Sequence, residues 1–85
     1  MIYTLYILKS NKSGRYYVGS TSNIIHRLAE HNGGRVKSTR AYIPWSVAYT
    51  KTFHSLSEAR RRELQAKSWK SRDAIEKLLA SSSNG

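Results

Sequence analysis

The chain has 85 residues, which allows one small domain, because a chain this short hides only about 60–65% of its unfolded surface. Its hydrophobic content of 39% predicts a folded globule rather than a disordered tail, and the absence of cysteine excludes disulfides and thiolate metal sites. Fifteen lysines and arginines against five acids give a net charge of +10, which favours a polyanionic partner, nucleic acid first.

Composition leaves an alternative open, a generic basic protein of the ribosomal or membrane-surface kind. The stretch MIYTLYILKS contains an apolar run too short to span a bilayer, and it lacks the basic leader and small-residue cleavage site of a signal peptide. We therefore expect a cytoplasmic protein without a membrane partner, which the lack of cysteine also suits. The sequence leaves the oligomeric state open.

Two strands are predicted first along the chain. Residues 2–8 are rich in β-branched and aromatic side chains, and a second strand begins at Tyr16. Between them lies a turn cluster of Asn11, Ser13 and Gly14. The two strands are expected to pair as a β-hairpin.

A helix is predicted to begin near Ile24, after three residues whose side-chain oxygens can cap it, and to end at a pair of glycines. Its expected apolar side consists of Ile24, Ile25 and Leu28. Residues 35–44 follow as a loop that carries several cations. We call its three cations, Arg35, Lys37 and Arg40, the basic loop residues.

A third strand is predicted over residues 45–53, with Trp45, Val47, Tyr49 and Phe53 alternating onto one face. Ser55 and Glu58 have capping-box spacing and open a helix over about residues 56–67. Ser71 can cap a last helix. Its apolar stripe is Ala74, Ile75, Leu78 and Leu79.

The predicted order is therefore β-β-α-β-α-α. Its compact solution is an α/β domain in which helices flank a central three-stranded antiparallel sheet. We expect residues 1–80 to form this single domain and residues 81–85 to be a frayed tail.

The acidic residues argue against chemistry that needs many ligands. They are Glu30, Glu58, Glu63, Asp73 and Glu76, scattered over three predicted helices. Two-metal hydrolysis needs several converging carboxylates, and the three histidines lack persuasive zinc spacing. An enzyme built on this chain would work with one carboxylate, one hard cation and basic or phenolic groups.

Glu63 is the unusual acid, because helical spacing places it among Leu56, Ala59 and Ala66 on the core-facing side. A carboxylate there needs a cation or hydrogen bonds to compensate its burial. A plain interpretation is also open, since Lys67 lies at i+4 and can form a helix ion pair with Glu63.

Four further side chains have the chemistry for phosphoryl transfer. Arg27 and His31 lie one turn apart on the first helix, where arginine suits a phosphate and histidine can move a proton. Tyr6 and Tyr17 lie on the paired strands, and Gly19, on the same face as Tyr17, clears space beside the backbone. A solvated helix face and ordinary strand packing remain the plain interpretations of these residues.

Together these segments resemble the GIY-YIG nuclease superfamily, in particular its compact single-domain bacterial members, which look like the N-terminal nuclease domain of excinuclease C. The matching elements, in chain order, are Thr4-Leu5-Tyr6, Tyr17-Val18-Gly19, Arg27 with His31 as R-x-x-x-H, Ser38-Thr39-Arg40, Pro44-Trp45 and Glu58 through Glu63 to Lys67. The match covers residues 2–79. Thr4, Leu5 and Val18 depart from the signature letters but keep strand-forming character.

The resemblance implies hydrolysis of DNA phosphodiester bonds with a single divalent cation, Mg²⁺ or Mn²⁺. It makes Glu63 the metal ligand, Arg27 the phosphate-binding arginine, Tyr6 and Tyr17 the phenols of which one is the general base, and His31 their assistant. The basic loop residues and Lys67 are expected to contact DNA.

Many superfamily members carry an asparagine after the metal glutamate, where this chain has Lys77 or its neighbours. We expect a nuclease that recognises DNA structure rather than sequence, in repair or recombination. The alternatives are a non-catalytic nucleic-acid-binding module of the same fold and a basic structural protein without a site.

Overall fold

The computed structural model describes residues 2–68 and 72–82. The elements are β1 (Tyr3–Ser10), β2 (Tyr16–Thr21), α1 (Ile24–Asn32), η1 (Arg40–Tyr42), β3 (Trp45–Phe53), α2 (Leu56–Ser68) and α3 (Arg72–Ser82). The predicted order is confirmed, and a short 3-10 helix, η1, is added within the loop 35–44. The expected cap Ser71, the side chain of Ala74 and residues 83–85 of the expected tail lie outside the described part.

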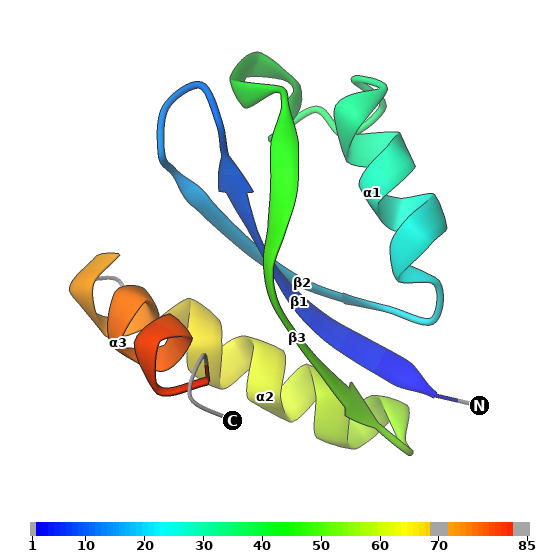
Figure 1. The fold of residues 1–85 in the computed structure, drawn as a ribbon. Helices are drawn as coiled ribbons and strands as arrows, with labels where there is room; N and C mark the ends of the chain where they lie inside the picture. The colour runs from blue at the N-terminus through cyan, green and yellow to red at the C-terminus, as the bar shows by residue number, and fades with distance from the viewer. Residues whose placement is uncertain (1, 69–71, 83–85) are drawn as a thin grey trace.

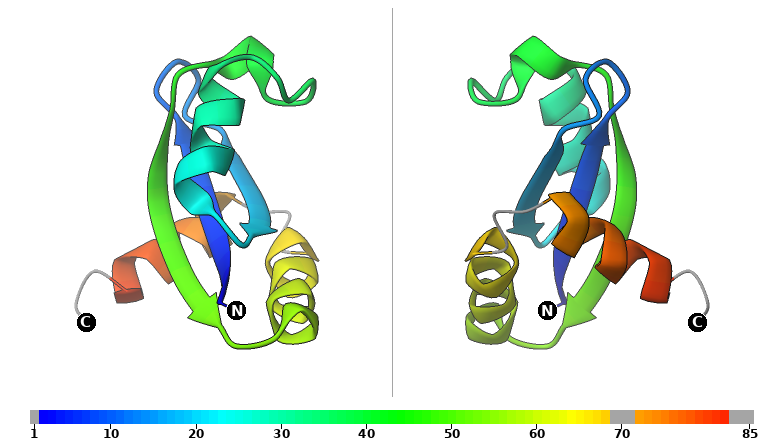
Figure 2. Two further views of the ribbon diagram at one scale, coloured as in Figure 1. Left: turned by 90° about the vertical axis from the view of Figure 1, so that its right-hand side faces the viewer. Right: turned by 90° about the vertical axis from the view of Figure 1, so that its left-hand side faces the viewer.

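The sheet is antiparallel with the order β2-β1-β3, so the first strand of the chain is central. Its residues Leu5 to Leu8 are buried on both faces. Helix α1 covers one face, and α2 with α3 covers the other (Figure 1). Figure 2 shows that α1 runs beside the upper part of the sheet while α2 and α3 cross its lower part.

Alternation along β1 divides the core between these two faces. Under α2 and α3, the buried residues are Leu5, Ile7, Val18, Ala66 and Ile75. Under α1, the buried residues are Tyr6, Leu8 and Trp45, with Ile24, Leu28 and Tyr17 packed against them. Tyr6 of the first strand therefore lies on the α1 face, together with Tyr17 of the second.

The third strand does not keep to one face as expected. Of the four residues predicted to share that face, Tyr49 and Phe53 lie on the other side of the sheet from Trp45. Leu8 pairs with Val47, but the next residue back in β1, Ile7, pairs with Tyr49. This β-bulge inserts Ala48 as an extra residue and so reverses the faces of all later positions. Trp45 consequently packs under α1, whereas Tyr49 and Phe53 pack under α2 and α3.

Helix α1 begins as expected, because the Asn23 side chain accepts a hydrogen bond from the His26 amide at 3.1 Å. The predicted apolar side is wrong for Ile25, which is 82% exposed. It points about 100° away from Ile24 around the helix and so misses the sheet. Helix α2 is capped as predicted by Ser55, whose Oγ accepts from the Glu58 amide at 3.2 Å. No helix in the described ranges is long and apolar enough to cross a bilayer.

Candidate active site

The first two strands bring a phenol and a glycine into direct contact. Tyr6 pairs with Gly19 across the hairpin. A Cβ atom added to Gly19 would lie 2.5 Å from the Tyr6 hydroxyl oxygen and 2.6 Å from Cζ. Glycine is therefore required here, because the Tyr6 phenol lies over its backbone, and the expectation that this glycine clears space is confirmed.

Helix α1 delivers two groups to that phenol. Arg27 donates from Nε to the Tyr6 hydroxyl at 3.4 Å, and His31 Nε2 lies 3.2 Å from the same oxygen. Both side chains reach β1 because residues one turn apart share a helix face. A second contact holds the guanidinium, whose Nη1 lies 3.5 Å from Glu30 Oε1. The predicted grouping of Arg27 and His31 with Tyr6 is thus present in the structure.

Burial sets the protonation of this group. It raises the pKa of Tyr6, and the hydrogen bond from Arg27 offsets the effect only in part. It also lowers the pKa of His31, with the charge of Arg27 acting in the same direction. The hydrogen bond to Tyr6 is the main cause that raises the pKa of Arg27. A neutral phenol and a neutral imidazole therefore lie beside a permanent cation.

Tyr17 joins the cluster through its ring. The ring stacks on Tyr6 with centroids 6.3 Å apart and meets His31 edge-on at 4.9 Å. The ring also contacts that of Trp45, with the centroids 6.4 Å apart. Within residues 2–68 and 72–82 its hydroxyl has no hydrogen-bond partner, so Tyr17 differs from Tyr6 in having a free phenol.

Glu63 approaches the cluster from the other face of the sheet. Its Oε1 accepts a hydrogen bond from Ser20 Oγ at 2.5 Å, and its Oε2 lies 2.6 Å from the Lys67 ammonium. The predicted ion pair with Lys67 is thus present. Ser20 follows Gly19 directly, and the Glu63 charge is near enough to contribute to the raised pKa of Tyr6.

The Glu63 carboxylate remains ionised although it is largely buried. Burial alone would raise its pKa, but the hydrogen bonds from Lys67 and Ser20 and the charge of Arg60 together lower it. Its side chain is 19% exposed, and Ala59 and Ala66 on the same side of α2 are buried. The predicted core-facing side is confirmed for these residues, whereas Leu56 is 41% exposed.

The donor set fits one hard cation and no cluster site. Among the described residues, no three histidine, cysteine or acidic side chains lie together as metal ligands would. Mg²⁺ is commonly held by one or two carboxylates, waters and a substrate phosphate, which Glu63 can satisfy. A divalent cation there would compete with the Lys67 ammonium for the same carboxylate oxygens.

The basic loop residues are all exposed and follow α1 directly. Between two of them lies Thr39, which is 1% exposed and has its Oγ1 2.8 Å from His31 Nδ1. The loop therefore borders the His31 end of the cluster. The ammonium of Lys67, the fourth expected DNA contact, lies 2.6 Å from Glu63 Oε2.

Ser20 and Thr39 are site residues that the sequence did not single out. Both stand within the stretches that carry the family resemblance, YYVGST and Ser38-Thr39-Arg40, and this was the only signal. Their partners, Glu63 and His31, are 43 and 8 positions away, which no local spacing reveals.

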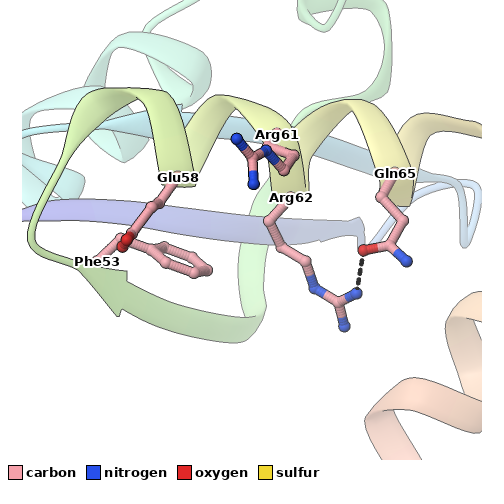
Figure 3. A pocket seen from close by; sticks show the side chains of 5 residues that line it. All are labelled: Phe53, Glu58, Arg61, Arg62 and Gln65. Carbon is pink, nitrogen blue, oxygen red and sulfur yellow. Dashed lines mark hydrogen bonds between the residues drawn. The ribbon is translucent and has the colours of Figure 1, made fainter.

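A hollow of about 240 Å³ lies away from this cluster. Its lining residues are Phe53, Glu58, Arg61, Arg62 and Gln65 (Figure 3). They belong to the end of β3 and to the side of α2 that faces β3, whereas Glu63 faces β2 at the opposite edge of the sheet. Within the hollow, Arg62 donates to Gln65 at 2.5 Å. None of the predicted site residues lines it.

A hairpin with two stacked tyrosines, an arginine and a histidine one turn apart on the next helix, and a glutamate after the third strand together define a nuclease-type domain. The family model of the GIY-YIG catalytic domain matches residues 2–77. The chain therefore belongs to the GIY-YIG family.

The chain is also similar to proteins named UPF0213. A UPF0213 protein of Halobacterium salinarum is 41% identical over 64 residues, which cover 74% of this chain and 82% of the relative. A UPF0213 protein of Listeria monocytogenes is 40% identical over 72 residues, 81% of this chain and 80% of the relative. The solution structure of a UPF0213 protein from Bacillus halodurans is similar with a TM-score of 0.60 and 33% identity, covering 94% of this chain and 84% of that one.

Proposed function

We propose that this protein is a metal-dependent endonuclease that hydrolyses phosphodiester bonds in DNA. One observation carries the proposal: Arg27 and His31 both contact the hydroxyl of Tyr6, beside an ionised Glu63. A phosphate-binding cation, a proton acceptor and a carboxylate for a hard cation are the groups that such a reaction needs. Membership in the GIY-YIG family supports the same reaction class.

Arg27 binds the phosphoryl group. Its Nε and Nη1 are committed to Tyr6 and Glu30, which fix the plane of the guanidinium and leave its other donors for phosphate oxygens. The side chain is 33% exposed, so a phosphate can reach it. Because these contacts fix the guanidinium before substrate arrives, it can stabilise the charge that develops on the phosphate.

The two phenols have different parts in activating water. Tyr6 has a proton acceptor behind it, because His31 Nε2 lies 3.2 Å from its hydroxyl. Tyr17 is partly exposed and its hydroxyl is free of partners among the described residues, so it can meet water or a nucleotide directly. The single variants Tyr6→Phe and Tyr17→Phe keep the rings and delete one hydroxyl each. At least one of them should be nearly inactive at an unchanged melting temperature, and full activity in both would exclude the phenols as the base.

Glu63 holds the cation, Mg²⁺ or Mn²⁺, with Ser20 keeping one of its carboxylate oxygens in place. When bound, such a cation polarises the scissile phosphate and stabilises the leaving oxygen. The contribution of the protein is to keep the carboxylate ionised next to the cluster, which the hydrogen bonds of Lys67 and Ser20 achieve against the effect of burial.

DNA is the partner, held mainly through its backbone. The net charge of +10 and the exposed basic loop residues beside His31 support binding that is strong in low salt and weak in sequence preference. We place the action in the cytoplasm, in repair or recombination, on DNA distinguished by its structure. Rates on nicked, flapped, branched and single-stranded substrates test this choice, and equal rates on plain duplex would contradict it.

Plasmid nicking tests the central proposal. The wild-type protein should nick supercoiled plasmid when Mg²⁺ or Mn²⁺ is present and should stop when the metal is chelated. Glu63→Gln should abolish nicking and leave DNA binding nearly intact, because it removes the charge and keeps the shape. Glu58→Gln is the matched control, since it is the same change on an exposed position of the same helix. Cleavage by Glu63→Gln at the rate of the Glu58→Gln control would refute the metal assignment.

One observation favours the alternative of a non-catalytic DNA-binding module with this fold. The Lys67 ammonium lies 2.6 Å from Glu63, so the carboxylate already has a cation as its partner. Salt-dependent binding of DNA without nicking in any divalent metal would establish this alternative. Absence of both nicking and binding would reject both functions.

A further inference from the structure

Thr39 is a buried polar residue to which the proposed reaction gives no role. It precedes η1, is 1% exposed, and has its Oγ1 at 2.8 Å from His31 Nδ1 and 3.3 Å from the Val36 carbonyl. Its own carbonyl accepts from the indole nitrogen of Trp45 at 2.9 Å, which ties this part of the loop to β3. The Thr39 hydroxyl is thus held in place from two sides.

The directions of these hydrogen bonds follow from what each group can donate. The Thr39 hydroxyl has one proton, which it can give to the Val36 carbonyl at 3.3 Å or to His31 Nδ1 at 2.8 Å, and the Val36 carbonyl can only accept. When that proton goes to Val36, Thr39 Oγ1 accepts from His31, and the imidazole proton is on Nδ1. In a neutral imidazole this leaves Nε2 with its lone pair facing the Tyr6 hydroxyl.

The hydrogen bonds of Tyr6 fit the same tautomer of His31. With Nε2 as acceptor, Tyr6 donates its proton to His31 and accepts from Arg27 Nε. The opposite tautomer would make both His31 and Arg27 donors to the Tyr6 oxygen, and the phenol proton would then have no acceptor among the described groups. That arrangement leaves a buried donor unpaired, which is costly.

We propose that Thr39 is a positioning residue that fixes the Nδ1–H tautomer of His31, so that Nε2 is free to accept the proton of Tyr6. The consequence for catalysis rests on the proposed function, because it matters only if Tyr6 and His31 move a proton during cleavage. The tautomer itself does not depend on cleavage, and it can be measured directly.

The test uses nitrogen-15 NMR of the histidine rings at a pH where His31 is neutral, with the His31→Gln spectrum identifying its signals. Wild type and Thr39→Ser should both show His31 protonated on Nδ1, since serine keeps the hydroxyl. Thr39→Val keeps the shape but cannot accept, and His31 should lose its preference for Nδ1–H. An Nε2–H tautomer in wild type, or an Nδ1–H tautomer kept in Thr39→Val, overturns the proposal.

The kinetic measurement links the tautomer to catalysis. Thr39→Val should lower kcat by about 10²-fold, the usual contribution of a positioned proton acceptor, with DNA binding unchanged, and Thr39→Ser should restore it. A valine variant that changes tautomer but keeps full kcat refutes the catalytic consequence alone. If wild type shows the Nδ1–H tautomer and yet never cleaves DNA, the proposed function fails while the tautomer assignment holds. Should the valine variant not fold, the wild-type and serine spectra still decide the tautomer.

Discussion

Adding one methyl group at Gly19 should disable this protein, and the structure gives the size of the disturbance. The Cβ atom of Gly19→Ala would lie 2.5 Å from the Tyr6 hydroxyl oxygen, 2.6 Å from Cζ and 3.2 Å from Cε1. Carbon atoms pack at about 3.5–4.0 Å, so the ring must recede by about 1 Å. The ring cannot recede freely, because Tyr6 is 1% exposed and lies against Tyr17 and His31.

Two effects follow from that displacement. Overpacking a buried site costs about 1–3 kcal/mol, and each kcal/mol lowers the melting temperature of a domain of this size by about 4–8 °C. The Tyr6 oxygen also leaves His31, from which it is separated by 3.2 Å, and a misplacement of about 1 Å at a reacting group costs about 10²-fold in rate. Backbone propensity alone predicts the opposite sign, since alanine is about 0.5–1 kcal/mol better than glycine within a strand.

Urea unfolding and plasmid nicking measure the two effects on the same preparation. The background variant Tyr6→Leu provides the control, because leucine has no atoms where the clash occurs. In that background Gly19→Ala should be neutral or slightly stabilising. A Gly19→Ala protein as stable and active as wild type would refute the contact, and an equal loss of stability in both backgrounds would place its cause elsewhere.

Three further outcomes are expected. Arg27→Ala should slow nicking by about 10²–10³-fold with little loss of DNA affinity, as when one preorganised donor is removed. If the variant instead loses DNA binding and keeps its turnover, Arg27 only contacts the DNA backbone. Replacing the three basic loop residues by alanine should make the slope of log binding constant against log salt concentration less steep. Each lost phosphate contact removes roughly 0.9 from that slope, and up to about three contacts should be lost. An unchanged slope would mean that DNA binds elsewhere on the protein. His31 has its pKa lowered in the folded protein, so below its ordinary value of about 6.5 the unfolded chain binds the proton first. The free energy of unfolding should therefore fall as pH drops through that window and level off below the folded pKa. Urea unfolding at several pH values should show a flatter dependence for His31→Gln, and equal slopes would contradict the buried neutral imidazole.

The helices and strands were predictable from short stretches of sequence, because the interactions that start and end them join residues only a few positions apart. The Asn23 and Ser55 caps each bond an amide three positions ahead, which sequence spacing displays. The faces of β3 were not predictable in this way. They depend on the extra residue Ala48, and a bulge is defined by how a strand pairs with its neighbour rather than by its own pattern.

The site was predictable only in part for the same reason. The family pattern placed Tyr6, Arg27 and His31 in one cluster, and the distances between them agree with that placement. The groups that support the cluster were missed, because Ser20 meets Glu63 across 43 positions and Thr39 meets His31 through a loop. Such contacts exist only after the sheet has brought its edges and helices together.

The two interpretations of Glu63, an ion pair with Lys67 and a metal ligand, do not exclude each other. A largely buried carboxylate would take up a proton if nothing opposed the effect of burial, and a protonated carboxyl cannot hold a hard cation. The hydrogen bonds of Lys67 and Ser20 keep its pKa low, so the ion pair maintains the charge that a metal needs. Lys67 can also move away from Glu63 when a metal binds, since its side chain is 47% exposed. If Glu63 serves only the ion pair, the Glu63→Gln protein should be less stable but should nick DNA at the wild-type rate. If Glu63 serves both roles, the variant should lose the nicking rate as well. The comparison with Glu58→Gln therefore separates a structural glutamate from one whose structural contacts prepare it for catalysis.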